Sequence, residues 1–161
     1  MPTLRFGRVD SPLGPIWVAE TDAGVVACSR ADAPDAFLAA VRRRFPGAEP
    51  HADDVDASWL GAARPRLDLT GLSAFDARVY RVVRDIPAGE TLTYGEVAAL
   101  IGSPGAARAV GGAMSRCPLF PAVPCHRVVR AADGWSGWGG DVALKRRLLS
   151  AERGARSPSA T

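Results

Sequence analysis

The first 70 residues alternate short apolar runs with turn-forming residues. Three runs, at residues 4–9, 16–20 and 25–29, have the length of strands and are separated by Ser-Pro-Leu-Gly and Thr-Asp-Ala-Gly. Turn residues of this kind between short apolar runs are typical of hairpins. We therefore predict three consecutive strands joined by tight turns at residues 11–14 and 21–24.

The next apolar positions change to a helical period. They recur at every fourth position, at Phe37, Val41 and Phe45. This spacing predicts a helix that ends at Pro46 and Gly47. An acidic, weakly patterned stretch at residues 48–58 predicts a surface loop before a short helix near Trp59, and residues 67–69 predict a last strand.

From residue 72 the hydrophobic pattern is again helical. One face of the first helix carries Phe75, Val79, Val82 and Ile86, and Pro87 to Gly89 end it. Thr93 and Glu96 have the spacing of a capping box, which predicts a helix that starts there and ends near Gly102. Ser103 and Pro104 then have the character of an N-cap and a first helical residue. Two short helices about two residues apart predict a helix-turn-helix.

The rest of the chain predicts one further helix. Several prolines between residues 117 and 129 exclude a continuous helix and favour extended backbone. A loop rich in Gly and Trp at residues 134–140 leads to a last helix that Asp141 caps and Gly154 ends. We expect residues 155–161 to form a disordered tail.

Charge is distributed unevenly along the chain. Residues 1–68 hold 8 Arg against 10 Asp and Glu, a balance of −2. Residues 69–161 hold 12 Arg or Lys against 7 Asp and Glu, a balance of +5. A polyanionic partner is therefore expected on the second part of the chain.

Composition excludes several classes of protein. The hydrophobic fraction of 47% is that of a globular protein, and no apolar run reaches the roughly 18 residues that a membrane span needs. The first residues lack the apolar segment of an export signal. Three cysteines without a C-x-x-C pair disfavour a disulfide framework or a zinc site, so we expect no metal and a reducing, cytoplasmic location.

Cys125 and His126 bring a thiol beside an imidazole. A neighbouring imidazole raises the fraction of the thiol that is ionised and nucleophilic. In a flat strand the two side chains would point to opposite faces, so a bend or a bridging water is needed for them to cooperate. Taken alone, the pair favours an inert cysteine in the core, because buried cysteines without chemistry are frequent.

The wider motif resembles a known family. Pro124-Cys-His-Arg-Val-Val129, preceded by Arg108-Ala-Val-Gly-Gly-Ala-Met114, resembles the O6-alkylguanine-DNA alkyltransferases, as do Ile86-Pro-Ala-Gly-Glu90 and Thr93-Tyr94. The resemblance covers roughly residues 72–154. It implies an α/β N-terminal domain at residues 1–70, which is ribonuclease-H-like and consists of a small sheet with a helix. It also implies a mainly α C-terminal domain at residues 71–154, with a winged helix-turn-helix fold.

The resemblance also implies an irreversible reaction, in which the alkyl group of O6-alkylguanine in double-stranded DNA passes to the protein. Cys125 is the implied alkyl acceptor, and His126 is the implied base, acting through a water. Glu152 orients that imidazole, and Tyr94 helps to rotate the nucleotide and polarises the purine. Without the motif, Glu152 would be interpreted as a solvated helix residue and Tyr94 as a half-buried aromatic.

DNA contacts are implied for the helix before the motif. Arg108 is the implied finger that fills the space of the extruded base, because the O6 substituent of a stacked guanine is out of reach of a protein sulfur. Close approach to DNA is implied for Ala107, Ala109, Gly111, Gly112 and Arg116. The implied substrate pocket comprises Met114, Val128, Trp135, Ser136, Trp138, Gly139 and Gly140. Small residues on this helix suit tight helix packing equally well.

Three positions depart from the family pattern. Trp138 stands where Tyr or Phe is usual, and Gly139 where Ser is frequent. Cys117 replaces an Asn that ties the end of the recognition helix to the active-site segment. Because a thiol is a weak donor and acceptor, that tie is expected to be weaker, and Cys117→Asn is expected to preserve or speed transfer.

Two other functions remain open on the sequence. A non-catalytic sensor of alkylguanine DNA is one, although such relatives typically replace the acceptor cysteine. A cysteine hydrolase built on the same residues is the other, and it would need an oxyanion site of its own. We expect the repair function, possible action on O4-alkylthymine, no cofactor and a monomeric protein.

Overall fold

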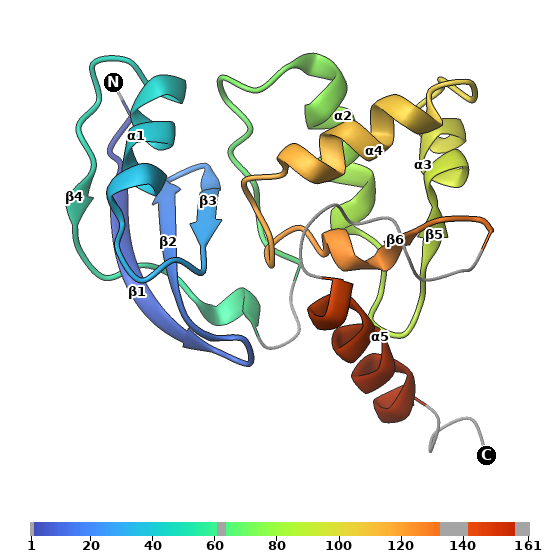
Figure 1. Ribbon diagram of the computed structural model, residues 1–161. Coiled ribbons are helices and arrows are strands. Elements are labelled where there is room, and N and C mark those ends of the chain that lie inside the picture. The colour runs from blue at the N-terminus through green and yellow to red at the C-terminus, as the bar shows by residue number, and fades with distance from the viewer. Residues whose placement is uncertain (1, 61–63, 133–141, 157–161) are drawn as a thin grey trace. The chain divides into compact units, whose positions relative to one another are not determined.

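The computed structural model describes residues 2–60, 64–132 and 142–156. The chain forms two compact units. The first comprises Met1–Ser73 and Pro118–Ala122, and the second comprises Ala74–Cys117 and Val123–Thr161 (Figure 1). The second unit therefore contains all described residues to which we attach chemistry.

A four-stranded sheet forms the first unit. Its strands are β1 (Arg5–Ser11), β2 (Gly14–Thr21), β3 (Gly24–Ser29) and β4 (His51–Ala52), in the order β3-β2-β1-β4. The first three are antiparallel neighbours, and β4 runs parallel to β1. Gly14 and Gly24 have positive φ at the two hairpin turns, which explains glycine at both positions. The three predicted strands and their turns are confirmed.

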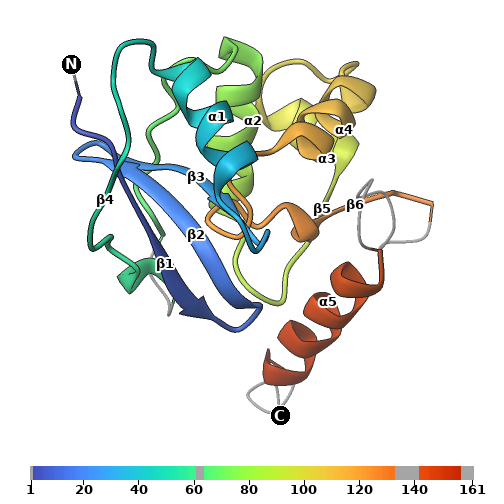
Figure 2. The ribbon, with the colours of Figure 1, turned by 60° about the vertical axis from the view of Figure 1, so that its left-hand side comes forward.

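Helix α1 (Asp35–Arg44) supplies the other half of the first unit's core. It packs against β3 (Figure 2) and buries Phe37, Leu38 and Val41. These side chains form one apolar cluster with Leu4, Ala19, Val26, Ala27, Phe45 and Ala48. The predicted helix is therefore confirmed, and a short 3-10 helix, η1 (Ser58–Leu60), follows near Trp59 as predicted.

Two predictions in the first unit were wrong. The segment at residues 48–58 is not only loop, because it contributes β4 to the edge of the sheet. Residues 67–69 form no strand, only an isolated bridge between Leu67 and Val25. Beyond that bridge, the Asp68 carboxylate accepts hydrogen bonds from the Thr21 hydroxyl at 2.5 Å and the Thr70 amide at 3.1 Å.

Four helices make up most of the described second unit. They are α2 (Ala74–Arg84), α3 (Tyr94–Leu100), α4 (Ala107–Arg116) and α5 (Val142–Arg156). Helices α2, α3 and α4 pack on one another (Figure 1). The two-residue strands β5 (Leu92–Thr93) and β6 (Val128–Val129) pair in parallel, and the 3-10 helix η2 (Cys125–Arg127) contacts α5.

The start of α3 confirms the predicted capping box. The Thr93 hydroxyl accepts a hydrogen bond from the Glu96 amide at 3.0 Å, and the Glu96 carboxylate accepts one from the Thr93 amide at 2.8 Å. Both donors would otherwise lack a partner at the helix end. This interaction involves only four consecutive residues, which explains why the sequence alone predicts it.

The predicted start of α4 at Ser103 and Pro104 was wrong. The Ser103 amide instead donates to Ala98 and the Gly102 amide to Ala99, which is a Schellman end for α3 with Gly102 at positive φ. Helix α4 starts at Ala107 without a side-chain cap. The connection between the two helices is therefore longer than the predicted two residues.

Other helix boundaries also differ from the predictions. Helix α2 ends at Arg84, and its buried face contains Val83 where we predicted Val82. Ile86 is buried but lies beyond the helix end. Helix α5 continues past Gly154 to Arg156, because glycine inside a helix is only mildly unfavourable. Within the described residues, none of the helices has the length and hydrophobicity needed to cross a membrane.

Candidate active site

The segment around Cys125 is bent and not extended as predicted. Pro124, with φ −77° and ψ 70°, forms an inverse γ-turn in which the Cys125 amide donates to the Val123 carbonyl at 2.8 Å. A 3-10 turn follows, closed by the Arg127 amide on the Pro124 carbonyl. Successive side chains in such a turn do not point to opposite faces. The bend therefore lets both Cys125 and His126 be buried, with 1% and 4% of their surfaces exposed.

Glu152 on α5 meets the imidazole of His126. The His126 Nε2 lies 2.8 Å from the Glu152 Oε2, and both side chains are largely buried. Arg127 binds the same carboxylate through two nitrogens, at 3.0 and 2.8 Å, and donates through Nη1 to the Ile86 carbonyl. Such a two-pronged arginine fixes both the position and the rotation of a carboxylate.

The charge of Glu152 determines which nitrogen of His126 carries the proton. Burial would raise the pKa of Glu152, but the hydrogen bonds from His126 and Arg127 outweigh burial and lower the pKa to about 2. An ionised carboxylate only accepts hydrogen bonds, so we assign the imidazole proton to Nε2. In the neutral ring, Nδ1 is then the basic atom. The arrangement can accept a proton on the side of the ring away from Glu152.

The environment of Cys125 disfavours ionisation of its thiol. Burial raises the pKa of Cys125 well above its usual range, and a hydrogen bond with the Cys117 side chain raises it further. The positive charge of Lys145 acts in the opposite direction. A protonated thiol is a poor nucleophile, so reaction requires a base. The adjacent His126 carries an imidazole, a group that can act as a base.

Tyr94, the first residue of α3, also belongs to this neighbourhood. Its hydroxyl is buried and has no hydrogen-bond partner among the described residues. Burial raises the pKa of Tyr94, Arg130 lowers it and Cys125 raises it, so the phenol lies within electrostatic reach of the thiol. A buried hydroxyl without a partner is costly. Such a group is available to donate to an incoming ligand.

Helix α4 is divided into a buried and an exposed face. It buries Val110, Ala113 and Met114, whereas Arg108 and Ala109 are exposed and Ala107, Gly111 and Gly112 are partly exposed. A Cβ on Gly111 would lie 4.0 Å from the Tyr94 ring, so α4 passes close to that side chain. Arg116, in the last turn of α4, is exposed and also pairs at 2.9 Å with the buried carboxylate of Asp76.

The remaining predicted pocket residues are placed differently. Met114 and Val128 are buried in the core, with 2% and 0% of their surfaces exposed. Trp135, Ser136, Trp138, Gly139 and Gly140 lie outside the described residues. In the described part of the chain, no cluster of His, Cys, Asp and Glu has the arrangement of a metal site.

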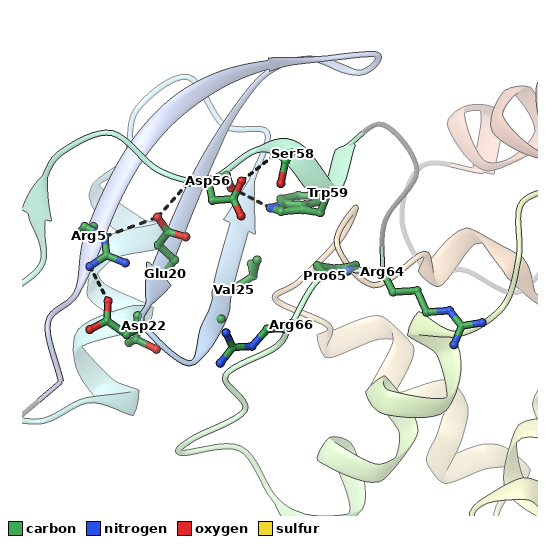
Figure 3. A pocket seen from close by; sticks show the side chains of 12 residues that line it. Arg5, Glu20, Asp22, Val25, Asp56, Ser58, Trp59, Arg64, Pro65 and Arg66 are labelled. Carbon is green, nitrogen blue, oxygen red and sulfur yellow. Dashed lines mark hydrogen bonds and ion pairs between the residues drawn. The ribbon is translucent and has the colours of Figure 1, made fainter.

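The first unit has a hollow of its own, with a cavity volume of about 410 Å³ (Figure 3). Three of its charged side chains are paired with one another: Arg5 lies 3.0 Å from the Asp22 carboxylate and 3.6 Å from that of Glu20. Glu20 also accepts a hydrogen bond from the Asp56 amide at 3.0 Å. These contacts hold the segment before η1 against the sheet. We interpret the hollow as structural.

Comparisons with known proteins agree with the geometry of the second unit. Residues 74–154 match the family described as 6-O-methylguanine DNA methyltransferase, DNA binding domain. A methylated-DNA–protein-cysteine methyltransferase of Mycolicibacterium paratuberculosis is 38% identical over 154 residues, covering 93% of each chain. The chain belongs to this methyltransferase family. It therefore carries the family's DNA-binding domain.

A further curated relative and two crystal structures are also similar to this chain. The bifunctional transcriptional activator/DNA repair enzyme Ada of Escherichia coli is 34% identical, over 92% of this chain and 45% of that protein. The crystal structure of a variant of Mycobacterium tuberculosis OGT matches with a TM-score of 0.70 and 32% identity, over 94% and 93% of the two chains. The crystal structure of Mycobacterium tuberculosis OGT in complex with DNA matches with a TM-score of 0.58 and 29% identity, over 93% of both chains. The fold is that of these alkyltransferases.

Lys145 and Arg127 are two site residues that our sequence analysis missed. Lys145, on α5, has 0% of its surface exposed and donates from Nζ to the Val128 carbonyl at 2.6 Å. It is the only lysine of the chain and lies on the same helical face as Leu149. A lysine on an apolar face is the signal that could have identified it. Arg127 gave no local signal, because its partner Glu152 is 25 residues away.

Replacing Lys145 by methionine is expected to slow transfer and lower stability. The Val128 carbonyl would lose its buried donor, which costs about 1–3 kcal/mol of unfolding free energy. Loss of the positive charge would also raise the pKa of Cys125 further, so the pH–rate profile of transfer should move to higher pH. Thermal unfolding and single-turnover rates at several pH values measure the two effects. Arg147→Met removes one positive charge from an exposed position on α5, and it should change neither the unfolding temperature nor the pH–rate profile.

Proposed function

We propose that this protein repairs DNA by direct damage reversal, transferring the alkyl group of O6-alkylguanine irreversibly to Cys125. The observation that carries the proposal is the buried pair Cys125 and His126, with the part-buried Glu152 hydrogen-bonded to the imidazole and its pKa lowered to about 2. This is the order of nucleophile, base and orienting carboxylate that nucleophilic catalysis uses. Membership of the methyltransferase family supports the same reaction.

Binding and base extrusion come first in the proposed reaction. Duplex DNA docks against the exposed face of α4. The side chain of Arg108 enters the DNA duplex there and occupies the position of the extruded guanine. Extrusion costs a few kcal/mol, less for a damaged base that pairs poorly. Ala107, Ala109, Gly111 and Gly112 allow the backbones to approach closely. Arg116 keeps one side exposed while it pairs with Asp76.

Transfer then requires one proton movement and one displacement. The Cys125 thiol gives its proton to Nδ1 of His126 through a water, and Glu152 stabilises the resulting imidazolium. The thiolate attacks the alkyl carbon, and the carbon–O6 bond breaks with its electron pair left on the guanine. The hydroxyl of Tyr94 donates toward the purine and stabilises that charge. The product is a thioether that no residue of the site can hydrolyse, so each chain reacts once.

The domains and the setting of the reaction complete the proposal. We assign the supporting role to a ribonuclease-H-like domain at residues 1–70, and DNA binding and alkyl acceptance to a winged helix-turn-helix domain at residues 71–154. The pocket loop comprises Trp135 to Gly140, and O4-alkylthymine is a possible second substrate. The protein acts as a monomer in the cytoplasm, a reducing compartment that suits three cysteines without a disulfide.

Stoichiometry tests the proposed function. Duplex DNA containing O6-methylguanine is supplied in excess, and repaired lesions are counted over time. The number of repaired lesions should rise to the number of protein molecules and then stop. Continued repair beyond that number would show catalytic turnover and contradict an irreversible transfer. Absence of any repair would contradict the function itself.

Arg108→Ala is expected to impair repair of duplex DNA far more than reaction with free O6-benzylguanine. A free base needs no extrusion, so only the duplex reaction should lose about tenfold to a hundredfold in rate. Single-turnover rates on both substrates provide the comparison. Arg81→Ala, an exposed arginine on α2, serves as the control. Equal losses on the two substrates would disprove the role of Arg108 in extrusion.

A further inference from the structure

The exposed face of α4 carries two arginines, one in its first turn and one in its last. Arg108, Gly112 and Arg116 recur at every fourth position, so they form one row along the helix. The buried residues of α4 lie outside this row. Eight residues separate the two arginines, which is roughly 12 Å along the helix axis. A duplex that docks along the row at Arg108 therefore also comes close to Arg116.

The side chain of Arg116 turns back over its own helix. A Cβ on Gly112 would lie 2.9 Å from the Arg116 Nη1, too close for both atoms to stay in place. The absence of a side chain at Gly112 therefore leaves room for the guanidinium. The Arg116 side chain still has 60% of its surface exposed, so the guanidinium lies on the helix surface and remains open to solvent.

Asp76 of α2 holds one edge of this guanidinium. Its carboxylate accepts hydrogen bonds from the Arg116 Nη2 at 2.9 Å and from Nε at 3.4 Å. These two bonds leave Nη1 outside the pair. The Asp76 side chain has only 12% of its surface exposed, so the carboxylate is mostly covered while the cation faces solvent. A guanidinium held at one edge in this way directs its remaining donors.

Tyr80, one turn beyond Asp76, fixes the same end of α4 on α2. Its buried hydroxyl donates to the Ala113 carbonyl at 2.8 Å. The Cys117 amide, the usual helical donor to that carbonyl, bonds to the carbonyl of the next residue at 3.3 Å, so Tyr80 satisfies a group left over at the helix end. Asp76 and Tyr80 share one face of α2. The last turn of α4 is therefore held at two points.

We propose that Asp76 positions Arg116 so that Nη1 donates to a phosphate of the DNA backbone. The inference rests on the proposed function, in which duplex DNA docks on α4, and it adds the residue that orients this contact. An arginine already held by a carboxylate loses little freedom on binding, so the pair favours binding although it places a negative charge near DNA. Because every nucleotide carries a phosphate, the contact is independent of sequence and lesion.

Binding of undamaged duplex DNA tests the phosphate contact without alkyl transfer. The anisotropy of a fluorescent duplex is measured with each protein at a series of KCl concentrations. Arg116→Ala should bind about tenfold more weakly at low salt, and its slope of log affinity against log salt should be shallower by about 0.9. Arg116→Lys should keep most of the slope but bind more weakly than wild type, because an ammonium lacks the two edges of a guanidinium. An unchanged slope in Arg116→Ala, or full affinity in Arg116→Lys, would overturn the proposal.

Asp76→Asn tests the positioning through the sign of its effect. A carboxylate that merely opposed the charge of Arg116 would strengthen binding when removed, whereas one that orients the guanidinium weakens binding by about twofold to fivefold when removed. We expect the weaker binding, and no effect of Asp76→Asn in the Arg116→Ala background. Asp85→Asn removes the same charge just beyond the end of α2 and should not weaken binding. Unchanged or stronger binding by Asp76→Asn, or an equal loss in both backgrounds, would refute the positioning role.

Reaction with free O6-benzylguanine separates positioning from folding. It involves no duplex, so Asp76→Asn and Arg116→Ala should both react at the wild-type rate. Loss of this reaction in Asp76→Asn would show that Asp76 supports the fold and not the DNA contact, which would overturn the proposal. Failure of the wild-type protein to react would instead count against the proposed function alone, because the binding measurements need no alkyl transfer.

Discussion

Replacement of Cys125 by serine is expected to abolish methyl transfer while duplex DNA binding is retained. A serine hydroxyl ionises far less readily than a thiol, and the alkoxide would have to form in the same buried site. DNA binding should persist because Cys125 exposes only 1% of its surface and contributes little to any contact area. A single-turnover assay with O6-methylguanine duplex and a gel-shift titration with the same duplex measure the two properties.

Cys28→Ser is the matched control for this experiment. Cys28 is a buried thiol on β3 of the first unit, whereas η2 and α5, which form the site, belong to the second. It should transfer methyl groups at the wild-type rate. Transfer by the Cys125 variant, or loss of transfer in the Cys28 variant, would place the acceptor elsewhere.

Glu152→Gln is expected to reduce the rate of transfer by about 10²–10⁴-fold, the usual contribution of a positioned base. A neutral glutamine lacks the negative charge that favours the imidazole proton on Nε2 of His126. It also loses the two hydrogen bonds that the carboxylate accepts from Arg127. The variant should remain folded. Glu90→Gln, a carboxylate of the same unit that lies outside the site, should leave the rate unchanged.

The same variant changes how stability depends on pH. The pKa of Glu152 is lowered to about 2 from the ordinary value of 4.5, so its ionised form stabilises the folded state above the ordinary value. That contribution is lost as the pH falls from about 4.5 through about 2. Wild type should therefore be more stable than Glu152→Gln at neutral pH, and the difference should shrink over that acidic range. A constant difference down to about pH 2 in denaturant unfolding would contradict the ionised state of Glu152.

The sequence predicts best those features that depend on a few consecutive residues. The hairpins around Gly14 and Gly24 and the capping box of Thr93 and Glu96 are local, and all were predicted. Ser103 shows the limit of such reasoning. It has the character of an N-cap, but its amide is engaged by the end of α3, so the next helix starts at Ala107. Competition between two neighbouring helix ends cannot be read from one residue type.

The candidate site shows a similar division. The motif led to Cys125, His126 and Glu152, and the structure brings the last two into contact at 2.8 Å. A bend or a bridging water at Cys125 and His126 was expected, but the place of the bend at Pro124, which lets thiol and imidazole both be buried, was not predicted. Lys145 was also missed, because its partner, the Val128 carbonyl, is 17 residues away. Such contacts depend on how α5 packs against η2, which periodicity does not reveal.

The most direct test of the account is the mass of the tryptic peptide 117–127 after the protein reacts with duplex DNA containing O6-methylguanine. We predict the added mass of one methyl group, located on Cys125 by fragmentation, with Cys117 and Cys28 still available to a thiol-blocking reagent. A methyl group found on another residue, or an unmodified peptide after the lesion has been repaired, would contradict the claim that Cys125 is the acceptor.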